Sequence, residues 1–305
     1  MKNVLVIYFS QTGQLYDIID NITASLQGED ITITTYKIAL EEPFPFPWDN
    51  DSFYGAFPET YLQIPKKVAP PTNPEIFDKQ YDLIIFGYQV WFLTPSNPIV
   101  SFLKTPWAKK VFANTPVVTV SATRNMWVQA QEKLKGYLRD FNATLVGNIA
   151  LVDRNINHVS VVTIVHWMFG GKKTKFLGIF PKPGVADKEI KEANKFGFPI
   201  KEALLNGDFS TLQTSLLAQG AVHIKPFLVQ IDKTGNMIFS KWAHLIIKKK
   251  ETRKKWTTIF KYYLLIAIWL VSPIVFIVFL IRYPFNQKRI KQDRAYYSSV
   301  EDNYS

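Results

Sequence analysis

The stretch VLVIYFSQTGQ, residues 4–14, decides the expected fold because it joins an apolar run to a loop of small and hydroxylated residues. The run at 4–9 is typical of a strand that is covered on both faces of a parallel sheet. Residues 14–26 continue with apolar side chains at helical spacing. A loop between such a strand and helix presents backbone N–H groups at the positive end of the helix, which suits a phosphate monoester.

The rest of the first half repeats this alternation of strands and helices. Further strands are predicted at 31–38, 81–87, 116–122 and 143–152, and helices at 97–104 and 125–141. The alternation predicts an α/β, doubly wound sheet of five parallel strands in the order 2-1-3-4-5, with right-handed crossovers. Residues 43–61, which are rich in Pro and aromatic residues, predict an insertion over one face of the sheet.

Two more loops follow strands that flank the switch point of this sheet, where ligands bind. GYQVWFLTPSNP, residues 87–98, offers Trp91 and Phe92 as a wall for a flat ring, and SATRNMW, residues 121–127, offers the cation of Arg124. Taken singly, the aromatic pair is explained better by core packing, and Arg124 equally well by a solvated loop. Three such loops at one sheet edge favour a ligand site.

YFSQTGQ and YDLIIFGYQVWFLTPSNPIVSFL together resemble the flavodoxin-like FMN proteins over residues 1–152. The resemblance implies FMN as cofactor and three binding loops. The phosphate would be held by Ser10, Gln11, Thr12, Gly13 and Gln14; the flavin ring would be lined by Gln89, Val90, Trp91, Phe92 and Leu93; and the third loop would be Ser121, Ala122, Thr123 and Arg124. The sequence departs from the family pattern in two ways that bear on FMN affinity and redox potential. Leu15 stands in place of a common Thr, and the third loop lacks its usual Gly or acidic residues.

The second half predicts an extension and a membrane segment. Residues 153–240 are expected to form a helical extension packing on the flavin domain, with an apolar segment at 158–169 and a helix at 187–206. Residues 241–261 are a basic juxtamembrane segment, residues 262–281 an apolar membrane anchor, and residues 282–305 a polar tail.

The anchor, YYLLIAIWLVSPIVFIVFLI, carries no charge over twenty residues, which matches the length of a transmembrane helix. Ser272-Pro273 at its centre keeps a re-entrant hairpin open as the alternative. Residues 241–261 hold eight Lys and Arg against five in 282–305, which predicts a cytoplasmic membrane protein whose flavin domain faces the cytoplasm. The cluster KKKETRKK, residues 248–255, predicts contact with anionic membrane lipids.

Charge and composition exclude several classes of function. The net charge is +11, but residues 241–305 hold 13 Lys and Arg against 4 Asp and Glu, while residues 1–240 hold 23 against 21. A nearly neutral body argues against a nucleic-acid surface. The chain has no Cys, which excludes disulfides and thiolate metal sites, and its four His residues show no metal-ligand spacing.

The whole architecture, with KPGVADKEI and KFGFPIKEAL in the extension, is similar to the dialkylresorcinol condensing enzymes of aryl-lipid and flexirubin-type pigment clusters. That resemblance implies a step in dialkylresorcinol synthesis. A chain without Cys has no thiol for Claisen chemistry. A flavin would instead oxidise a dialkylcyclohexanedione to the aromatic resorcinol. His158 is the first candidate for the base that takes the proton. Arg124 is the candidate for stabilising anionic reduced flavin or an enolate, and Tyr88 is a candidate proton donor.

Two other functions fit the same residues. One is a quinone-linked, flavodoxin-type dehydrogenase similar to protoporphyrinogen dehydrogenase, and the other is a membrane-tethered electron carrier with no substrate site. The partners expected are therefore a hydrophobic, lipid-like substrate and membrane lipids, with a quinone or a small acidic carrier protein as further candidates. The insertion and the long extension argue against a simple carrier, which has no evident use for them.

Overall fold

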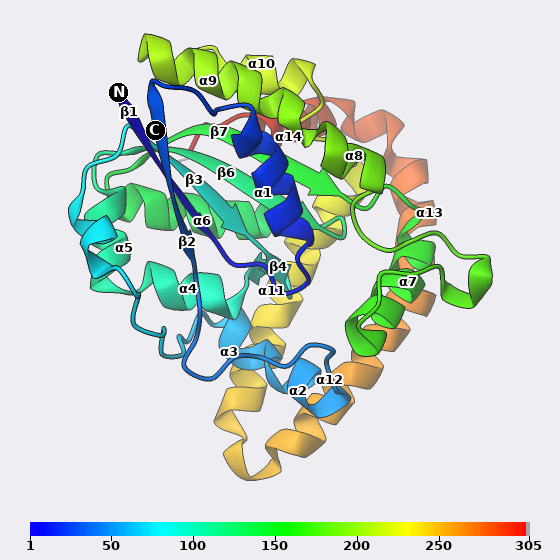
Figure 1. Ribbon diagram of the computed structural model, residues 1–305. Helices are drawn as coiled ribbons and strands as arrows, with labels where there is room; N and C mark the ends of the chain where they lie inside the picture. The colour runs from blue at the N-terminus through cyan, green and yellow to red at the C-terminus, as the bar shows by residue number, and fades with distance from the viewer. Residues whose placement is uncertain (303–305) are drawn as a thin grey trace.

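The computed structural model describes residues 1–302, and its centre is one sheet of five parallel strands (Figure 1). The strands are β1 (Lys2–Tyr8), β2 (Ile31–Lys37), β3 (Leu83–Tyr88), β6 (Pro116–Thr123) and β7 (Thr144–Val152). They lie in the order β2-β1-β3-β6-β7. This is the predicted order 2-1-3-4-5, so the flavodoxin-like fold class is confirmed.

One face of the sheet is covered jointly by the first helix and by the C-terminal extension. The helices on this face are α1 (Gln14–Ala24), α8 (Asp187–Lys191), η3 (Glu192–Phe196), α9 (Gly197–Asn206) and α10 (Leu212–Ala218). A single helix was expected over 187–206, but a 3₁₀ segment divides it. Gly197 allows this close packing on α1, because a Cβ there would lie 2.2 Å from the carbonyl oxygen of Ile22.

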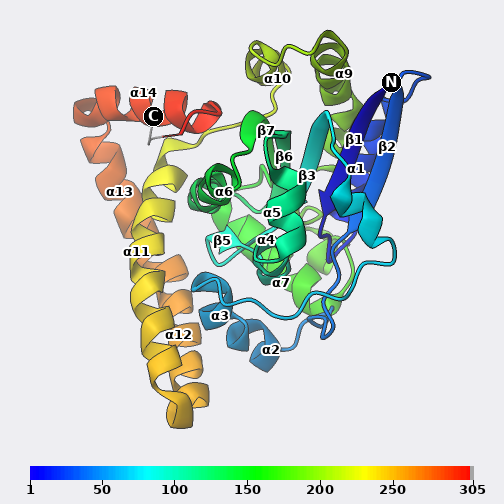
Figure 2. The ribbon, with the colours of Figure 1, turned by 90° about the vertical axis from the view of Figure 1, so that its left-hand side faces the viewer.

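The opposite face is covered by elements from the first half alone (Figure 2). They are η1 (Pro74–Asp78), α4 (Asn97–Leu103), α5 (Pro106–Phe112) and α6 (Val128–Asp140). Because helices cover both faces, every residue of β3 is buried, as its continuous apolar run predicts.

Shorter elements lie beyond the carboxyl edge of the sheet. The aromatic insertion contains α2 (Asn50–Gly55) and α3 (Phe57–Tyr61), and a two-stranded ribbon of β4 (Val90–Trp91) and β5 (Thr94–Pro95) follows β3. The apolar segment predicted at 158–169 is α7 (Asn157–Gly170), which is followed by the short turn η2 (Phe176–Gly178).

The last quarter of the chain forms long helices along one side of the sheet domain (Figure 2). They are α11 (Pro226–Lys248), η4 (Lys250–Thr252), α12 (Arg253–Ile266), the π-helical turn η5 (Ala267–Val271), α13 (Ser272–Arg282), η6 (Pro284–Asn286) and α14 (Gln287–Ser298). Helix α11 runs straight through residues 240 and 241, where a boundary between extension and juxtamembrane segment was expected.

The apolar anchor is part of one continuous helix, Lys250–Arg282, which is long and apolar enough to cross a membrane by length and composition. The hairpin alternative is therefore wrong for this structure. The physical reason lies at η5, where the helix widens by one residue and the N–H of Ser272 bonds the carbonyl of Ala267. This widening accommodates Pro273 without reversing the chain.

Candidate functional site

Three of the predicted loops meet at the carboxyl edge of the sheet. In the register of the strands, Tyr8 at the end of β1 pairs with Gly87, and Tyr88 at the end of β3 pairs with Ser121. The loops 10–14 and 89–93 therefore follow two adjacent strands, β1 and β3. The predicted third loop, 121–124, begins inside the next strand, because Ser121, Ala122 and Thr123 are the last residues of β6 and only Arg124 lies beyond it. The topology brings the sequence-predicted residues to one edge, as ligand binding at a switch point requires.

The first loop has the backbone of an anion site. Gly13 caps the N-terminus of α1 in a left-handed conformation, with φ +86°. Within residues 1–302, no atom other than those of its two chain neighbours lies within 4 Å of the position that a Cβ would take. Ser10 is buried, and its Oγ accepts the N–H of Tyr16 at 3.4 Å. The N-terminal N–H groups of an 11-residue helix thus face a space that glycine keeps open.

Two distant segments cover this loop. Gln11 donates from Nε2 to the carbonyl of Pro45 at 3.1 Å and accepts the indole N–H of Trp48 at 3.0 Å. Gln14 accepts the backbone N–H of Val185 through Oε1 at 2.9 Å. The insertion and the extension therefore both close over the candidate phosphate loop.

The second loop is a tight ribbon with strained backbone. Phe92 and Leu93 at its tip both have positive φ, 51° and 64°, a conformation that hairpin turns normally give to Asn or Gly. Aromatic packing holds Phe92 in place, since its ring centroid lies 5.1 Å from that of Phe53 and 5.2 Å from that of Phe57. Strain of this kind in bulky residues concentrates at functional sites.

Trp91, in the same ribbon, lies inside a cluster of aromatic rings. Its ring centroid is 6.0 Å from that of Phe9, 5.2 Å from that of Phe44 and 5.3 Å from that of Trp48, each in an edge-on arrangement. The insertion thus packs against the wall predicted for a flat ring, while Trp91 keeps partial exposure.

The third loop holds a half-buried cation in a polar network. Arg124 donates from Nη1 to Oδ1 of Asn157 at 3.0 Å, and Asn125 donates from Nδ2 to the same oxygen at 2.8 Å. Burial lowers the pKa of Arg124 to about 10, although the negative charge of Asp153 opposes that shift. At neutral pH the guanidinium therefore remains a cation.

Buried polar atoms without a hydrogen-bond partner occur in all three loops. Within residues 1–302 they include Nε2 of Gln14, Oε1 of Gln89 and Oδ1 of Asn125. A buried polar atom that lacks a partner costs free energy, so these three atoms can take a partner that the described chain does not supply. Donors and acceptors at these positions, together with the N-terminus of α1, fit a ligand that carries a phosphate and a polar ring.

Tyr88 does not fit the donor role expected for it. Its side chain is fully buried, and its hydroxyl donates to Oε1 of Gln131 at 2.6 Å. Gln131 in turn donates to Thr119 at 3.2 Å. Burial also raises the pKa of Tyr88 well above its ordinary value. The hydroxyl supports the sheet core and has no route to a substrate.

His158 lies on α7 and faces the apolar helix. Its Nε2 is 3.1 Å from the carbonyl oxygen of Ile268, and its ring centroid is 5.3 Å from that of Trp269. A carbonyl oxygen only accepts hydrogen bonds, so Nε2 carries the proton and Nδ1 is the ring nitrogen that remains available as a base.

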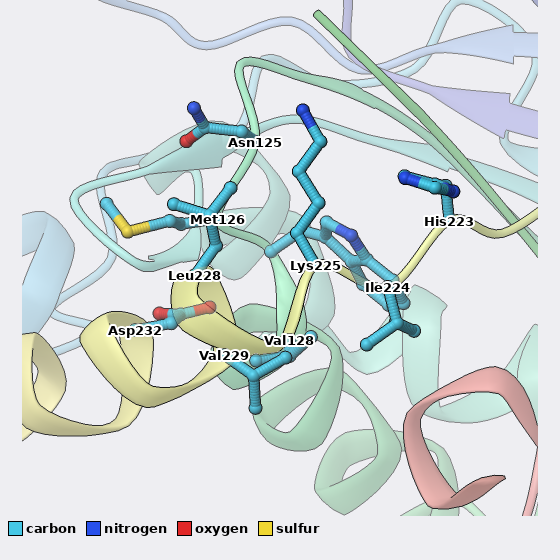
Figure 3. Close-up of a pocket in the computed structure, with 10 residues that line it drawn as sticks. Asn125, Met126, Val128, His223, Ile224, Lys225, Leu228, Val229 and Asp232 are labelled. Atoms are coloured by element: carbon cyan, nitrogen blue, oxygen red, sulfur yellow. The ribbon is translucent and has the colours of Figure 1, made fainter. Parts of the chain in front are cut away.

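A buried acid beside the third loop escaped prediction. Asp232 of α11 is fully buried, and its Oδ2 accepts the N–H of Gln129 at the start of α6 at 3.3 Å. Burial raises its pKa to about 7. It borders a cavity of about 10 Å³, the size of one water molecule, which Met126, Trp127 and His223 also line (Figure 3). No local signal marks Asp232, because its partners lie about a hundred residues away.

Comparison with known proteins gives distant structural likenesses. A flavoprotein from Lactobacillus acidophilus NCFM, solved in complex with FMN, is 17% identical, with 49% of this chain and 93% of that chain covered and a TM-score of 0.38. A flavodoxin from the domain Archaea is 11% identical, with 67% and 99% covered and a TM-score of 0.36. A flavoenzyme NAD(P)H:(acceptor) oxidoreductase from Paracoccus denitrificans is 12% identical, with 68% and 98% covered and a TM-score of 0.34.

No protein-family model matches the chain, and no curated protein matches it. The fold class therefore rests on the strand order and register described above.

Proposed function

We propose that this protein is an FMN-dependent oxidoreductase that acts at a membrane on a hydrophobic ring. The observation that carries the proposal is the meeting of three loops at one sheet edge. There Gly13 opens the N-terminus of α1, and buried polar atoms of Gln14, Gln89 and Asn125 have no partner in the described chain. Parallel sheets of this order bind their ligands at this edge.

The residues present fit FMN in chemical type. The loop 10–14 offers hydroxyls and backbone N–H groups to the phosphate, the ribbon around Trp91 offers aromatic surface to the ring, and Asn125 and Gln89 offer polar atoms to the ring edge. When bound, FMN supplies a hydride acceptor.

The proposed reaction is the aromatisation of a dialkylcyclohexanedione to a dialkylresorcinol. The substrate ring would give up one hydride and one proton, which would leave the aromatic ring. Bound FMN would supply the hydride acceptor, a side chain would accept the proton, and a quinone or dioxygen would be the final acceptor of the two electrons. The absence of Cys from the chain supports an oxidation over a thiol-dependent condensation.

Two side chains serve this reaction in the proposal. Arg124, a half-buried cation at the third loop, stabilises the negative charge of an enolate or of the reduced ring. His158 accepts the proton at Nδ1, because its Nε2 is bonded to Ile268. The apolar helix beside His158 supports a lipid-like substrate.

A quinone-linked dehydrogenase would use the same site on a different ring, and it is the second candidate. An electron carrier needs an exposed flavin edge. Here Trp48 bonds the candidate phosphate loop and packs on Trp91, so the insertion covers the site that a carrier would leave open. This contact favours an enzyme.

An anaerobic titration of the full-length, detergent-purified protein with a synthetic dialkylcyclohexanedione tests the proposal. We expect the flavin absorption to bleach stoichiometrically while a resorcinol forms. Bleaching with a quinol or another dehydrogenase substrate, and none with the dione, would favour the second candidate. A colourless protein that takes up no FMN would overturn the flavin assignment itself.

A further inference from the structure

The helix Lys250–Arg282 displays a broad apolar surface. In its 18-residue apolar window only 6% of the residues are buried, so it is not a core helix. The large apolar side chains that stay exposed on it include Ile266, Leu270, Ile274, Ile277 and Ile281. A patch of this extent on a folded protein marks an interaction surface.

The start of this helix is fixed to the folded body. Arg253 forms a two-pronged ion pair with Glu59 of α3, with N–O distances of 2.5 and 2.6 Å. About two turns further along, the ring of Phe260 stacks on that of Phe57 with centroids 3.9 Å apart. A bidentate ion pair beside a stacked aromatic pair is a specific attachment.

The middle of the helix is fixed as well, and Pro273 explains how. In the π-helical register of η5 the carbonyl of Ile268 would pair with the N–H five residues on, but residue 273 is a proline without an N–H. Nε2 of His158 supplies the missing donor at 3.1 Å. The body therefore satisfies a backbone group that the helix itself leaves unpaired.

The chain beyond the helix returns to the same body. Lys233 of α11 pairs with Asp293 of α14 at 2.8 Å, and Glu132 of α6 accepts the hydroxyl of Tyr296 at 2.6 Å. Gln213 of α10 donates to the carbonyl of Ser298 at 2.7 Å. Figure 2 shows α14 lying across the end of α11, beside the sheet domain.

These attachments exclude a membrane crossing in the docked state. A helix of 33 residues is about 50 Å long, and a bilayer core is about 30 Å thick. If the helix crossed, Arg253 and Asp293 would lie on opposite sides of the bilayer. Both instead bind elements of one folded body.

We propose that this helix lies in the plane of an anionic bilayer leaflet, with the body and α14 on the same side of the membrane. The inference rests on the proposed membrane association and replaces a crossing anchor by an in-plane one. The body covers one side of the helix and leaves the other, apolar side free, and an in-plane position would bury that side at the boundary between headgroups and acyl chains.

The distribution of charge indicates that an anionic bilayer leaflet covers the apolar surface of the helix. Exposed basic side chains flank the apolar surface at both ends: Lys248, Lys249, Lys250, Lys254 and Lys255 before it, and Lys288, Arg289 and Lys291 after it. An in-plane helix has both ends at the level of the headgroups, so both basic groups contact anionic lipid. A groove of about 490 Å³ between α2 and α12 opens at the first end. Lys254 and Lys261 line it together with Asp51, which pairs with Lys254 at 3.0 Å.

A cross-linking experiment on the full-length chain tests the topology. The chain has no Cys, so the double variant Lys233→Cys, Asp293→Cys carries the only two thiols. We expect a short bis-maleimide to link them to the same extent in detergent and in phosphatidylglycerol vesicles. A link that forms in detergent and is lost in vesicles would show that the helix crosses. The pair Thr72→Cys, Asp293→Cys gives the background of links between molecules.

Flotation of the unmodified protein with vesicles tests whether an anionic lipid surface covers the helix. We expect it to float with phosphatidylglycerol vesicles and much less with phosphatidylcholine vesicles. Equal flotation with both would contradict the electrostatic part of the proposal. No flotation, with a dimer in sedimentation, would show that a second copy covers the helix. Neither experiment requires bound FMN or turnover, so a failure here is distinct from a failure of the proposed reaction.

Discussion

Nε2 of His158 lies 3.1 Å from the carbonyl oxygen of Ile268, a hydrogen bond between residues 110 positions apart. It joins the extension that follows the sheet to the centre of the apolar helix. The carbonyl is available because residue 273 is a proline, and the helix widens into a π turn just before it. The residue predicted to be a base thus also supports the apolar helix.

Replacing His158 with Phe removes this bond but keeps an aromatic ring beside Trp269. We expect a loss of about 1 kcal/mol in the free energy of unfolding and faster hydrogen exchange of the amides in 262–271. His166→Phe serves as the control, because His166 lies on the same helix, is partly exposed and contacts Thr174 rather than the apolar helix. If Pro273→Ala is added, the helix can pair the carbonyl itself, and His158→Phe should then cost less. Equal costs in both backgrounds would contradict the account of the π turn.

Gly13→Ala should weaken FMN binding, measured by quenching of flavin fluorescence. The added Cβ enters the space before the N-terminus of α1, and φ +86° disfavours any side chain. Gly207→Ala is the control, since Gly207 follows the last residue of α9 with φ +69° and equally open surroundings. Both variants place a side chain at positive φ. An equal change in FMN affinity in the two variants would show that the phosphate does not bind at the N-terminus of α1.

Arg124→Gln should slow turnover of the dione about 10²-fold or more, as loss of an electrostatic donor does, while the protein still binds FMN. The control is Arg154→Gln, which removes an exposed cation paired with Glu189. Single-turnover bleaching of the flavin isolates the chemical step. An unchanged rate constant for Arg124→Gln would remove this residue from the reaction.

Tyr88→Phe should reduce the free energy of unfolding by about 1–3 kcal/mol, because Oε1 of Gln131 loses its buried donor. Turnover should stay unchanged, since the hydroxyl has no route to a substrate. Denaturant unfolding and steady-state kinetics on the same preparation separate the two effects. A large loss of turnover in a stable variant would restore the donor role.

Asp232 should make the protein less stable as pH rises from about 4 to about 7. Its pKa in the folded state is raised to about 7 from an ordinary 3.8, so the folded state holds a proton that the unfolded state has already lost. The stability present below pH 4 is therefore lost as pH rises through 7, by up to about 1.4 kcal/mol per pH unit.

Asp232→Asn should flatten that slope in denaturant unfolding measured across pH 4–8, because the amide does not titrate. Asp140→Asn, at an exposed position on α6, should leave the slope as it is in the parent protein. The same slope in Asp232→Asn and the parent would assign the pH dependence to other groups.

The local sequence predicted the sheet because apolar runs and the loops that end them are short-range signals. The run at 4–9 and the loop with Gly13 fix a strand, a turn and a helix start within about twenty residues, and the alternation of such units sets the strand order. The same short-range signals predict that 10–14, 89–93 and 121–124 lie at one edge of the sheet.

Only the tertiary structure decided which side chains are free to act. Tyr88 is bonded inside the core, Nε2 of His158 is committed to Ile268, and Asp232 is buried against α6. It also decided that the apolar run lies along the body. Composition determines how apolar a helix is, but contacts between residues more than a hundred positions apart determine where it lies, and no short-range pattern encodes them.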